Sequence, residues 1–280
     1  MMWHVIGSTG FIGRSLIEKL PPDVSYRCYA RHPKAKERQI DLLNLTLDSC
    51  SEVQAGDYVV LLAAVSSPDI CRAQYEMAYA INVTGTKQLL AECLRRDARV
   101  LFFSSDVVVG ATDQPHNETM PVSPSGAYGK MKREIEVEFL NDPRFKVFRL
   151  SYVFSKEDKF MKYLRKCVDD DEEADVFQAL YRNVVYLGDV LEAVVALGKN
   201  FDAWSNPIFH LSGPELLCRA DMAECFRKTI TPSLRYTTRM PAGGFFEARP
   251  NVIETYSLYL ERLLGHEPTA LTEALKLEYT

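Results

Sequence analysis

Apolar residues in the first half of the chain form short continuous runs, separated by longer segments whose apolar positions recur about every three to four residues. Short continuous runs are typical of buried strands, whereas the longer spacing is typical of amphipathic helices. The predicted strands are Trp3–Ile6, Val24–Tyr29, Tyr58–Ala64, Val100–Ser104 and Lys146–Leu150. The predicted helices are Arg14–Leu20, Asp69–Arg96 and Lys130–Leu140.

The alternation weakens after Leu150. The predicted elements of this second half are a helix over Lys156–Val168, a strand over Asn183–Leu187, a helix over Gly188–Leu197, a strand over Asn206–Ser212, a helix over Ala220–Thr229 and a helical region from Glu254 onward. The acidic run 169–173 is interpreted as a solvated loop, because adjacent carboxylates repel one another.

Strands that alternate with helices predict right-handed crossovers and an α/β fold with a Rossmann-type, doubly wound parallel sheet. We expect residues 1–155 to form an NAD(P)-binding domain, to which residues 183–200 return. Residues 156–182 and 201–280 are expected to form a smaller C-terminal substrate-binding lobe. The strand ends at Gly7, Ala30, Ala63 and Ser104 are expected to line one crevice, where such sheets bind ligands.

Composition narrows the possible classes of protein. The formal net charge of -5 carries no basic excess, so nucleic acid is not an expected partner. The longest apolar run is far too short to cross a bilayer, and no membrane partner is expected. The 7 cysteines show no metal-ligand spacing and are expected to be reduced thiols in the cytoplasm, with no bound metal.

Three glycines, Gly7, Gly10 and Gly13, follow the first predicted strand at a regular spacing. A strand, a glycine loop and a helix in this order wrap backbone amides around a pyrophosphate. Side chains at these positions would hold the phosphates away from the amides and the helix away from the strand. The segment therefore predicts a site for a dinucleotide.

A second pattern places a phenol and an ammonium group on the same side of a helix. Tyr128 and Lys132 are separated by one helical turn. Either pattern alone is weak evidence for an active site. Together, a nucleotide site and a Tyr/Lys pair predict redox chemistry.

Four segments together resemble the extended short-chain dehydrogenase/reductase family: the glycine loop, the Asn-Val-Thr-Gly-Thr sequence at 82–86, Ser104-Ser105-Asp106, and Tyr128 with Lys132. The order and spacing of these segments carry the resemblance over most of the chain. It implies a Rossmann-type fold and an NAD(P)-dependent oxidoreductase or epimerase. The cofactor-binding residues that follow from the glycine loop and the resemblance are Gly7, Thr9, Gly10, Phe11, Ile12, Arg31, Asp41, Leu42, Ala63, Ala64, Asn82, Tyr128 and Lys132.

The chemistry explains why Ser105, Tyr128 and Lys132 are the predicted catalytic residues. A carbonyl carbon accepts hydride only if the charge that builds on its oxygen is met by a proton. Because a free tyrosine has a pKa of about 10, we expect the positive charge of Lys132 to lower the pKa of Tyr128. Tyr128 would then exchange the proton with the substrate oxygen, and Ser105 would hold that oxygen by a hydrogen bond. The resemblance further implies that Lys132 reaches the nicotinamide ribose. For Asn82, a buried structural role is as consistent with the sequence as a direct one.

The end of the second predicted strand bears on the choice of cofactor. Enzymes that prefer NAD usually carry a carboxylate there, which binds the adenosine ribose hydroxyls. This chain has Arg31 near that point and no acid, which favours NADP(H) over NAD(H). A solvated basic loop, or an arginine stacked on adenine, are the alternatives. Asp41 and Leu42 resemble the family's adenine-binding segment.

The residues after Ser105 separate the reactions of the family. No second carboxylate follows Asp106, which disfavours dehydration, and the segment 104–110 resembles that of dTDP-4-dehydrorhamnose reductases, although Val107 replaces an aromatic residue. The leading hypothesis is an NADP(H)-dependent reductase of a nucleotide-linked 4-keto sugar, with Ser105, Arg182 and Arg249 as substrate-binding residues. The alternatives are an NAD-retaining nucleotide-sugar epimerase and a non-catalytic nucleotide-binding subunit. Family members often form homodimers through the helix with the tyrosine, and the surface composition does not decide this point.

Overall fold

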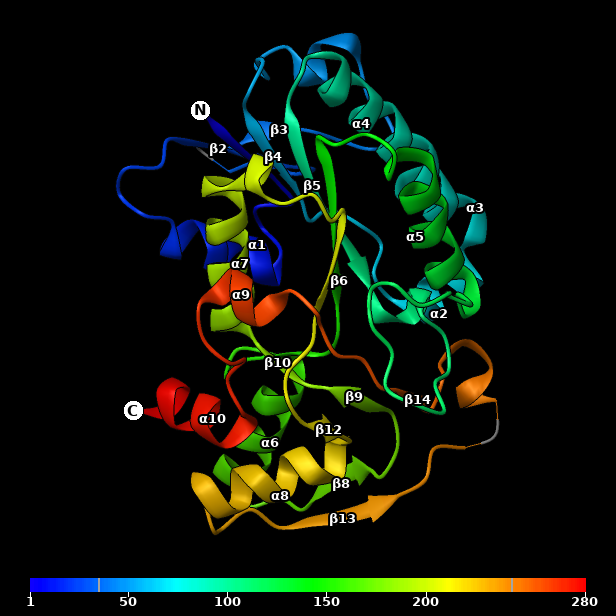
Figure 1. The fold of residues 1–280 in the computed structure, drawn as a ribbon. Coiled ribbons are helices and arrows are strands. Elements are labelled where there is room, and N and C mark those ends of the chain that lie inside the picture. The colour runs from blue at the N-terminus through cyan, green and yellow to red at the C-terminus, as the bar shows by residue number, and fades with distance from the viewer. Residues whose placement is uncertain (35, 243) are drawn as a thin grey trace.

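A seven-stranded parallel sheet forms the centre of the larger part of the molecule (Figure 1). The computed structural model describes residues 1–34, 36–242 and 244–280. The strand order is β11-β6-β5-β4-β1-β2-β3. The bounds are β1 Trp3–Ile6, β2 Tyr26–Ala30, β3 Arg38–Gln39, β4 Tyr58–Leu61, β5 Arg99–Ser105, β6 Phe145–Leu150 and β11 Ile208–Leu211. The predicted Rossmann-type α/β fold is confirmed.

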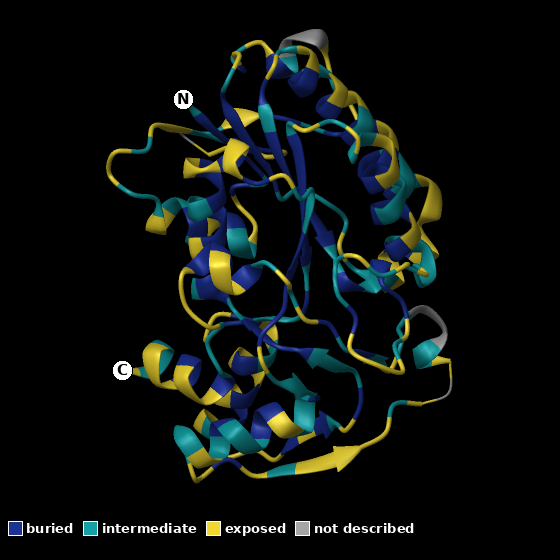
Figure 2. Ribbon diagram, in the orientation of Figure 1, coloured by how far each residue is buried: buried dark blue, intermediate teal, exposed yellow. Residues whose placement is uncertain are grey.

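Helices cover both faces of this sheet (Figure 1). One face carries α1 (Phe11–Lys19), α7 (Leu187–Lys199) and α9 (Leu260–Leu264), and the other carries α2 (Pro68–Ala73), α3 (Tyr75–Tyr79), α4 (Thr86–Arg95) and α5 (Gly126–Phe139). The central strands β1, β4, β5 and β6 are buried, whereas the outer faces of the helices are exposed (Figure 2). Each face of the sheet therefore has its own hydrophobic core.

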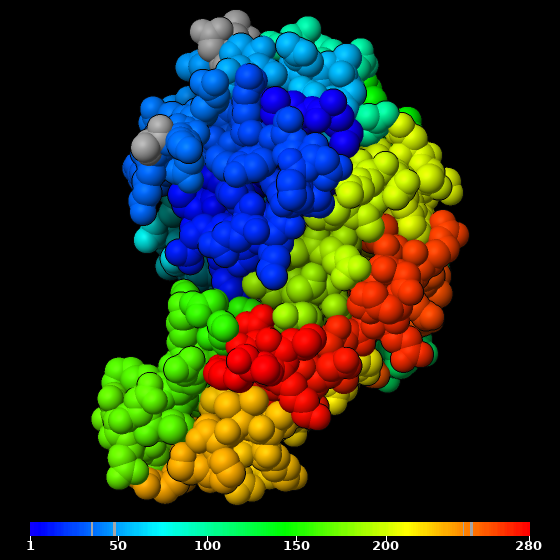
Figure 3. Space-filling view, turned by 90° about the vertical axis from the view of Figure 1, so that its left-hand side faces the viewer, coloured from blue at the N-terminus to red at the C-terminus, as the bar shows by residue number. Residues whose placement is uncertain are grey.

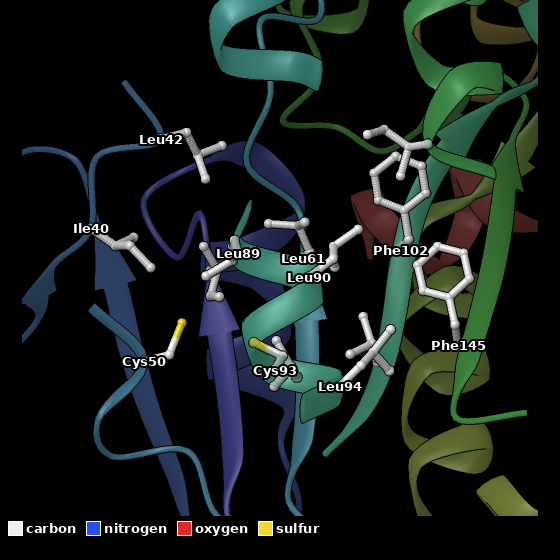
Figure 4. Close-up of a cluster of buried hydrophobic side chains, with 14 of the residues drawn as sticks. Ile40, Leu42, Cys50, Leu61, Leu89, Leu90, Cys93, Leu94, Phe102 and Phe145 are labelled. Carbon is white, nitrogen blue, oxygen red and sulfur yellow. The ribbon is translucent and has the colours of Figure 1, made fainter. Parts of the chain in front are cut away.

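The core on the α4 side shows how the sequence pattern becomes packing. Leu89, Leu90 and Cys93 recur along one face of α4 and point toward the sheet, where they meet Leu61 of β4 and Phe102 of β5 (Figure 4). All of these side chains are buried. Burial of this apolar stripe fixes the helix across the strands and so fixes the strand ends that form the crevice.

The long helix predicted over Asp69–Arg96 is wrong as a single element. α2 ends at Ala73, the backbone of Gln74 leaves the helical region, and α3 is followed by a π-helical turn, η2 (Ala80–Gly85), before α4 begins. The π turn inserts one residue and shifts the apolar face locally, which the spacing of apolar residues over a long segment does not resolve. This turn carries Asn82.

A smaller lobe lies below the sheet (Figure 1) and projects from the blue N-terminal part in the space-filling view (Figure 3). Its core packs α6, α8 and α10 against short strands. The bounds are β7 Val153–Phe154, α6 Lys159–Asp169, β8 Ala174–Phe177, β9 Tyr181–Asn183, β10 Val185–Tyr186, β12 Leu216–Leu217, α8 Arg219–Thr229, β13 Tyr236–Arg239, β14 Val252–Ile253 and α10 Leu271–Tyr279. Short 3-10 turns are η1 Leu47–Cys50, η3 Asp106–Val108, η4 Phe201–Ala203 and η5 Phe245–Ala248.

Two expectations for the second half need correction. β11 pairs with β6 in the central sheet, and α9 packs on α7, so parts of the segment 201–280 belong to the larger part of the molecule. The predicted helical region from Glu254 is also wrong at its start, because Glu254 follows a strand and the next helix begins at Leu260. A local apolar pattern shows neither which sheet a strand joins nor where a short helix begins, because both depend on packing partners from other segments.

Candidate active site

The glycine loop connects β1 to α1 by a path that side chains would block. Gly7 has a φ of +92°, and a Cβ there would lie 2.7 Å from the backbone nitrogen of Ala63. A Cβ on Gly13 would lie 2.4 Å from the carbonyl oxygen of Gly7. Both distances are too short for any side chain, so the loop and the first turn of α1 close onto each other and onto β4. This shape fits the binding of a dinucleotide phosphate, as predicted.

A cavity of about 280 Å³ opens beside this loop at the carboxyl ends of β1, β2 and β4. Most of the predicted cofactor residues line it, namely Gly7, Thr9, Gly10, Arg31, Asp41, Leu42, Ala63 and Ala64. Phe11 and Ile12 begin α1 and pack against the core instead. Residues that are far apart in the sequence thus meet at one crevice, because the ends of neighbouring parallel strands share one edge of the sheet.

The expected strand-end crevice needs one correction, at Ser104. Its side chain is buried and its hydroxyl donates a hydrogen bond to Glu136, so it faces away from the cavity. Because successive side chains of a strand point to opposite faces, Ser105, the next residue of β5, faces the other side from Ser104.

The rim of the cavity near Arg31 holds charges of both signs. The Nε atom of Arg31 lies 3.5 Å from a carboxylate oxygen of Asp41, and the Arg31 side chain is 53% exposed. Glu37 accepts hydrogen bonds from the Ser8 hydroxyl at 3.1 Å and from the backbone of Lys34 at 2.8 Å. The sequence shows no acid directly at the end of the second strand. In the folded chain, Glu37 from the loop after that strand nevertheless reaches the glycine loop, and the apolar pattern of the strand does not predict this contact.

Asn82 acts on the cofactor cavity through the backbone. Its side-chain oxygen accepts a hydrogen bond from the Val65 nitrogen at 2.8 Å, and its amide donates one to the Val65 oxygen at 2.9 Å. Asn82 is buried, and Val65, not Asn82, lines the cavity. Of the two alternatives that the sequence left open, the structure matches the structural one: Asn82 holds the loop after β4 in place.

Tyr128 and Lys132 lie one turn apart on α5, which begins earlier than predicted, at Gly126. The Nζ atom of Lys132 donates a hydrogen bond to the carbonyl of Phe103 at 2.7 Å and lies 5.7 Å from the centre of the Tyr128 ring. A Cβ on Gly129 would lie 2.9 Å from the carbonyl of Val107, so α5 packs closely on the segment that follows β5. This contact brings the tyrosine helix next to the strand end that carries Ser105.

The expectation that Lys132 lowers the pKa of Tyr128 is not met in this structure. Burial raises the pKa of Tyr128 well above its usual value, and the nearby Cys71 and Asp106 raise it further. Burial lowers the pKa of Lys132 to about 7, although Glu136 and Cys71 oppose this shift. A buried amine loses the hydration that stabilises its charge, so the pair is less charged near neutral pH than the sequence suggested.

Ser105 and Arg182 are linked through a buried carboxylate. The Ser105 hydroxyl donates a hydrogen bond to Asp106 at 3.1 Å, and Ser151 donates one to the second oxygen of Asp106 at 3.3 Å. The Nε atom of Arg182 lies 3.4 Å from that same oxygen. Burial raises the pKa of Asp106, and the positive charge of Arg182 opposes this shift.

A second cavity, of about 240 Å³, lies between the end of β5 and the smaller lobe. Asp106, Ser151 and Arg182 line it, together with Arg219, which the sequence analysis missed. Arg219 is the first residue of α8 and its guanidinium lies 4.0 Å from the centre of the Tyr152 ring. No local pattern marks this residue, because the relevant signal is the position of the helix end in space.

Arg249, the other predicted substrate residue, is placed elsewhere. It forms an ion pair with Asp69 of α2 and lies 4.8 Å from the centre of the Phe245 ring. It does not line the cavity that contains Arg182. The predicted substrate arginines are therefore not brought together.

The described part of the chain offers neither a metal site nor a membrane span. No group of three or more histidines, cysteines and acids within residues 1–34, 36–242 and 244–280 could hold a metal ion. In the same part of the chain, none of the helices has the length and apolar character needed to cross a membrane.

Comparison with known proteins identifies relatives of the chain. Residues 1–240 match the family described as the RmlD substrate binding domain. The dTDP-4-dehydrorhamnose reductase of Mycobacterium tuberculosis (strain CDC 1551 / Oshkosh) is 29% identical over 153 residues, which cover 52% of this chain and 50% of that protein. The chain thus spans about half the length of this relative. The methionine adenosyltransferase 2 subunit beta of Xenopus tropicalis is 25% identical over 86% of this chain and 76% of that protein.

Solved structures share the fold over the whole chain. A dTDP-4-dehydrorhamnose reductase from Clostridium acetobutylicum superimposes with a TM-score of 0.81 at 22% identity and covers 100% of this chain and 98% of its own. A UDP-glucuronic acid 4-epimerase from Bacillus cereus, solved with UDP-glucuronic acid and NAD, gives a TM-score of 0.78 at 19% identity, with 100% and 98% coverage. At these identities the likeness extends to the fold alone.

Proposed function

The chain belongs to the RmlD substrate binding domain family, within the extended short-chain dehydrogenases/reductases, and from this premise we propose that it is an NADP(H)-dependent reductase of a nucleotide-linked 4-keto sugar. One observation carries the proposal. Tyr128 and Lys132 of α5 lie beside the end of β5 that carries Ser105, since Lys132 bonds to the Phe103 carbonyl and Gly129 packs against the Val107 carbonyl. A cavity suited to a dinucleotide and a cavity lined by two arginines lie at the carboxyl ends of strands of the same sheet.

In this proposal Tyr128 supplies the proton to the substrate oxygen. The phenol is protonated at neutral pH and so holds the proton that reduction consumes, although the pKa raised by burial makes it a weaker acid than a free tyrosine. Ser105 holds the same oxygen after its hydroxyl turns from Asp106 toward the substrate. The bound nicotinamide would supply the hydride, and Lys132 would hold its ribose.

The second cavity is the proposed site for the nucleotide-sugar. Arg182 and Arg219 present positive charge to it from two elements of the smaller lobe. Guanidinium groups bind diphosphate oxygens through paired hydrogen bonds, so a nucleoside diphosphate is the substrate class that this lining favours. Arg249 does not line this cavity and is no longer part of the proposed substrate site.

The preference for NADP(H) rests on Arg31. This arginine lines the cofactor cavity, is largely exposed and lies beside the segment after β2, where a 2′-phosphate needs a cation. Glu37 bonds to Ser8 of the glycine loop, and its negative charge would repel the 2′-phosphate. The preference for NADP(H) over NAD(H) is therefore expected to be moderate.

Two other functions remain as alternatives, each with its own observation. Solved structures that share this fold include a UDP-glucuronic acid 4-epimerase with NAD, so an epimerase that keeps its cofactor is the first alternative. The alignment with a methionine adenosyltransferase subunit, over 86% of this chain, favours a nucleotide-binding regulatory subunit. Retention of Ser105, Tyr128 and Lys132 speaks against the latter, because a binding subunit needs no proton donor.

The test starts with the purified protein. Mass spectrometry of the nucleotide released on denaturation shows whether a cofactor is retained. Near-stoichiometric NAD would support the epimerase and contradict the proposal. A protein that binds NADPH more tightly than NADH and oxidises it in the presence of a nucleotide-linked 4-keto sugar would support the reductase. Tight NADPH binding without turnover of any such sugar would favour the regulatory subunit.

A further inference from the structure

The two serines at the end of β5 face opposite sides of the strand. Ser105 bonds to Asp106 on the cavity side, whereas Ser104 is buried and donates its hydroxyl proton to Glu136 at 2.7 Å. Glu136 is a fully buried carboxylate of α5. The strand that carries the proposed catalytic serine is therefore tied to the helix that carries the tyrosine.

Glu136 lies one turn beyond Lys132, so Tyr128, Lys132 and Glu136 follow one face of α5. Lys132 bonds to the carbonyl of Phe103 and Glu136 bonds to the hydroxyl of Ser104, each at 2.7 Å. Two consecutive residues of β5 are thus bound by two successive turns of α5. This pair of bonds fixes how far the helix slides along the strand.

The charge of Glu136 is strongly coordinated. Arg149 of β6 donates to both of its oxygens, at 3.0 and 2.8 Å, and Arg133 donates to one of them at 3.0 Å. Two guanidinium groups thus bind the buried carboxylate through charge-assisted hydrogen bonds. The contacts make Glu136 the anion at the centre of a group of cations that includes Lys132.

We propose that Glu136 is a positioning residue for the reaction put forward above: it locks α5 onto β5, which holds Tyr128 and Ser105 in register, and its negative charge favours the ammonium form of Lys132. The effect of Glu136 on the reaction rests on the proposed function. Its contacts between α5 and β5 and its charge effect on Lys132 do not depend on that function.

Besides Glu136, Cys71 raises the pKa of Lys132, and further titratable groups lie on the neighbouring elements. Tyr128 and Arg133 lie on α5, Arg149 lies on β6 with His210 of β11 in contact with it, Cys71 lies on α2, and Asp106 follows β5. His210 is held neutral, because burial and Arg149 lower its pKa to about 3. Removal of the Glu136 charge would leave Lys132 among uncompensated arginines, so its protonated form would become less favourable.

The charge effect can be measured without turnover. Carbon-13 labelled lysine gives an NMR titration for Lys132, assigned by its loss in Lys132→Met. We expect Glu136→Gln to lower the titration midpoint by about one pH unit. Glu138→Gln, which removes the same charge from an exposed position of the same helix, is the control and should leave the midpoint unchanged. An unchanged midpoint in Glu136→Gln would overturn the charge part of the proposal.

Glu136→Gln leaves Arg149 without its carboxylate and can fail to fold, so Ser104→Ala provides a second test. This variant removes the bond between strand and helix and leaves every charge in place. We expect kcat to fall on the order of tenfold, with KM and the affinity for NADPH unchanged, because only the relative placement of Ser105 and Tyr128 is disturbed. Ser104→Thr keeps the hydroxyl and should restore most of kcat.

The results separate this inference from the proposed function. If the wild-type protein reduces no nucleotide-linked keto sugar, the proposed function fails, and the Lys132 titration still decides the role of Glu136. If the wild-type protein is active and Ser104→Ala retains full kcat, the positioning role is refuted while the proposed function stands. A lower titration midpoint together with a lower kcat would support the inference.

Discussion

The Nε atom of Arg182 lies 3.4 Å from a carboxylate oxygen of Asp106, and this pair joins β9 of the smaller lobe to the end of β5. Both side chains are almost fully enclosed, at 12% and 8% exposure. Since Asp106 also accepts the hydrogen bond of Ser105, the pair connects the proposed catalytic serine to the proposed substrate arginine.

Arg182→Ala should destabilise the protein by about 3 kcal/mol, because it leaves the Asp106 charge buried without its partner. The free energy of unfolding in urea measures this loss. Arg219 lines the same cavity, but its guanidinium contacts aromatic rings and a tyrosine hydroxyl instead of a buried carboxylate. Arg219→Ala should therefore lower the free energy of unfolding by less. The double variant Asp106→Asn/Arg182→Ala should recover part of the loss, and purely additive effects would contradict the pairing.

Tyr128→Phe should lower turnover of a nucleotide-linked keto sugar by roughly 10²- to 10⁴-fold, because the proton donor is removed. The affinity for NADPH should be unchanged, since the ring remains. Tyr79→Phe is a suitable control, because the Tyr79 hydroxyl bonds to Glu134 rather than to the proposed active-site residues. Initial rates and fluorescence titration with NADPH provide the measurements. Full activity of Tyr128→Phe would rule out the proposed mechanism.

Arg31→Ala should weaken NADPH binding by about tenfold and leave NADH binding nearly unchanged, because only NADPH carries the 2′-phosphate. Arg27 lies on β2, shortly before Arg31, and its guanidinium is 3.5 Å from Glu52, so Arg27→Ala is the matched control. Dissociation constants for both cofactors decide the question. Equal losses for NADPH and NADH would assign Arg31 to a contact that both cofactors share.

Gly13→Ala should impair both folding and cofactor binding. The new Cβ would lie 2.4 Å from the Gly7 carbonyl oxygen, so α1 would have to move away from the phosphate loop. Gly10→Ala, with a distance of 3.3 Å to the same atom, should cost less stability. Thermal unfolding with and without NADPH tests this order, and a Gly13→Ala protein as stable as the wild type would contradict the packing described.

The lowered pKa of Lys132 predicts a pH dependence of stability. Above pH 7 the folded state holds Lys132 neutral, while the unfolded chain keeps it protonated up to about pH 10.4. The unfolded state therefore binds more protons, and stability should rise with pH in this interval by about 1 kcal/mol per unit from this group. The contribution is absent in Lys132→Met, so urea unfolding of both proteins at pH 7 and 9 should show a steeper rise for the wild type. Parallel pH profiles would indicate that Lys132 stays charged.

Some features follow from short segments and were predicted correctly. β1 was predicted with its observed bounds, and β6 was found to within a residue, because continuous apolar runs next to turn residues fit only buried strands here. The glycine loop was also predicted, since a spacing of glycines records a backbone path that side chains would block. Helix α5 was placed a turn too late, because Gly126 and Ala127 carry no apolar period.

The sequence by itself determined the doubly wound sheet and the glycine loop between β1 and α1, because each depends on local pattern and chain order. Only the tertiary structure decided the charge state of Lys132, the pairing of Arg182 with Asp106 and of Arg249 with Asp69, and the approach of Glu37 to Ser8. These features depend on burial and on distances between segments that are remote in the chain. The pKa of a side chain depends on its burial and on the charges around it, and an ion pair depends on two segments meeting in space. A local sequence pattern specifies neither.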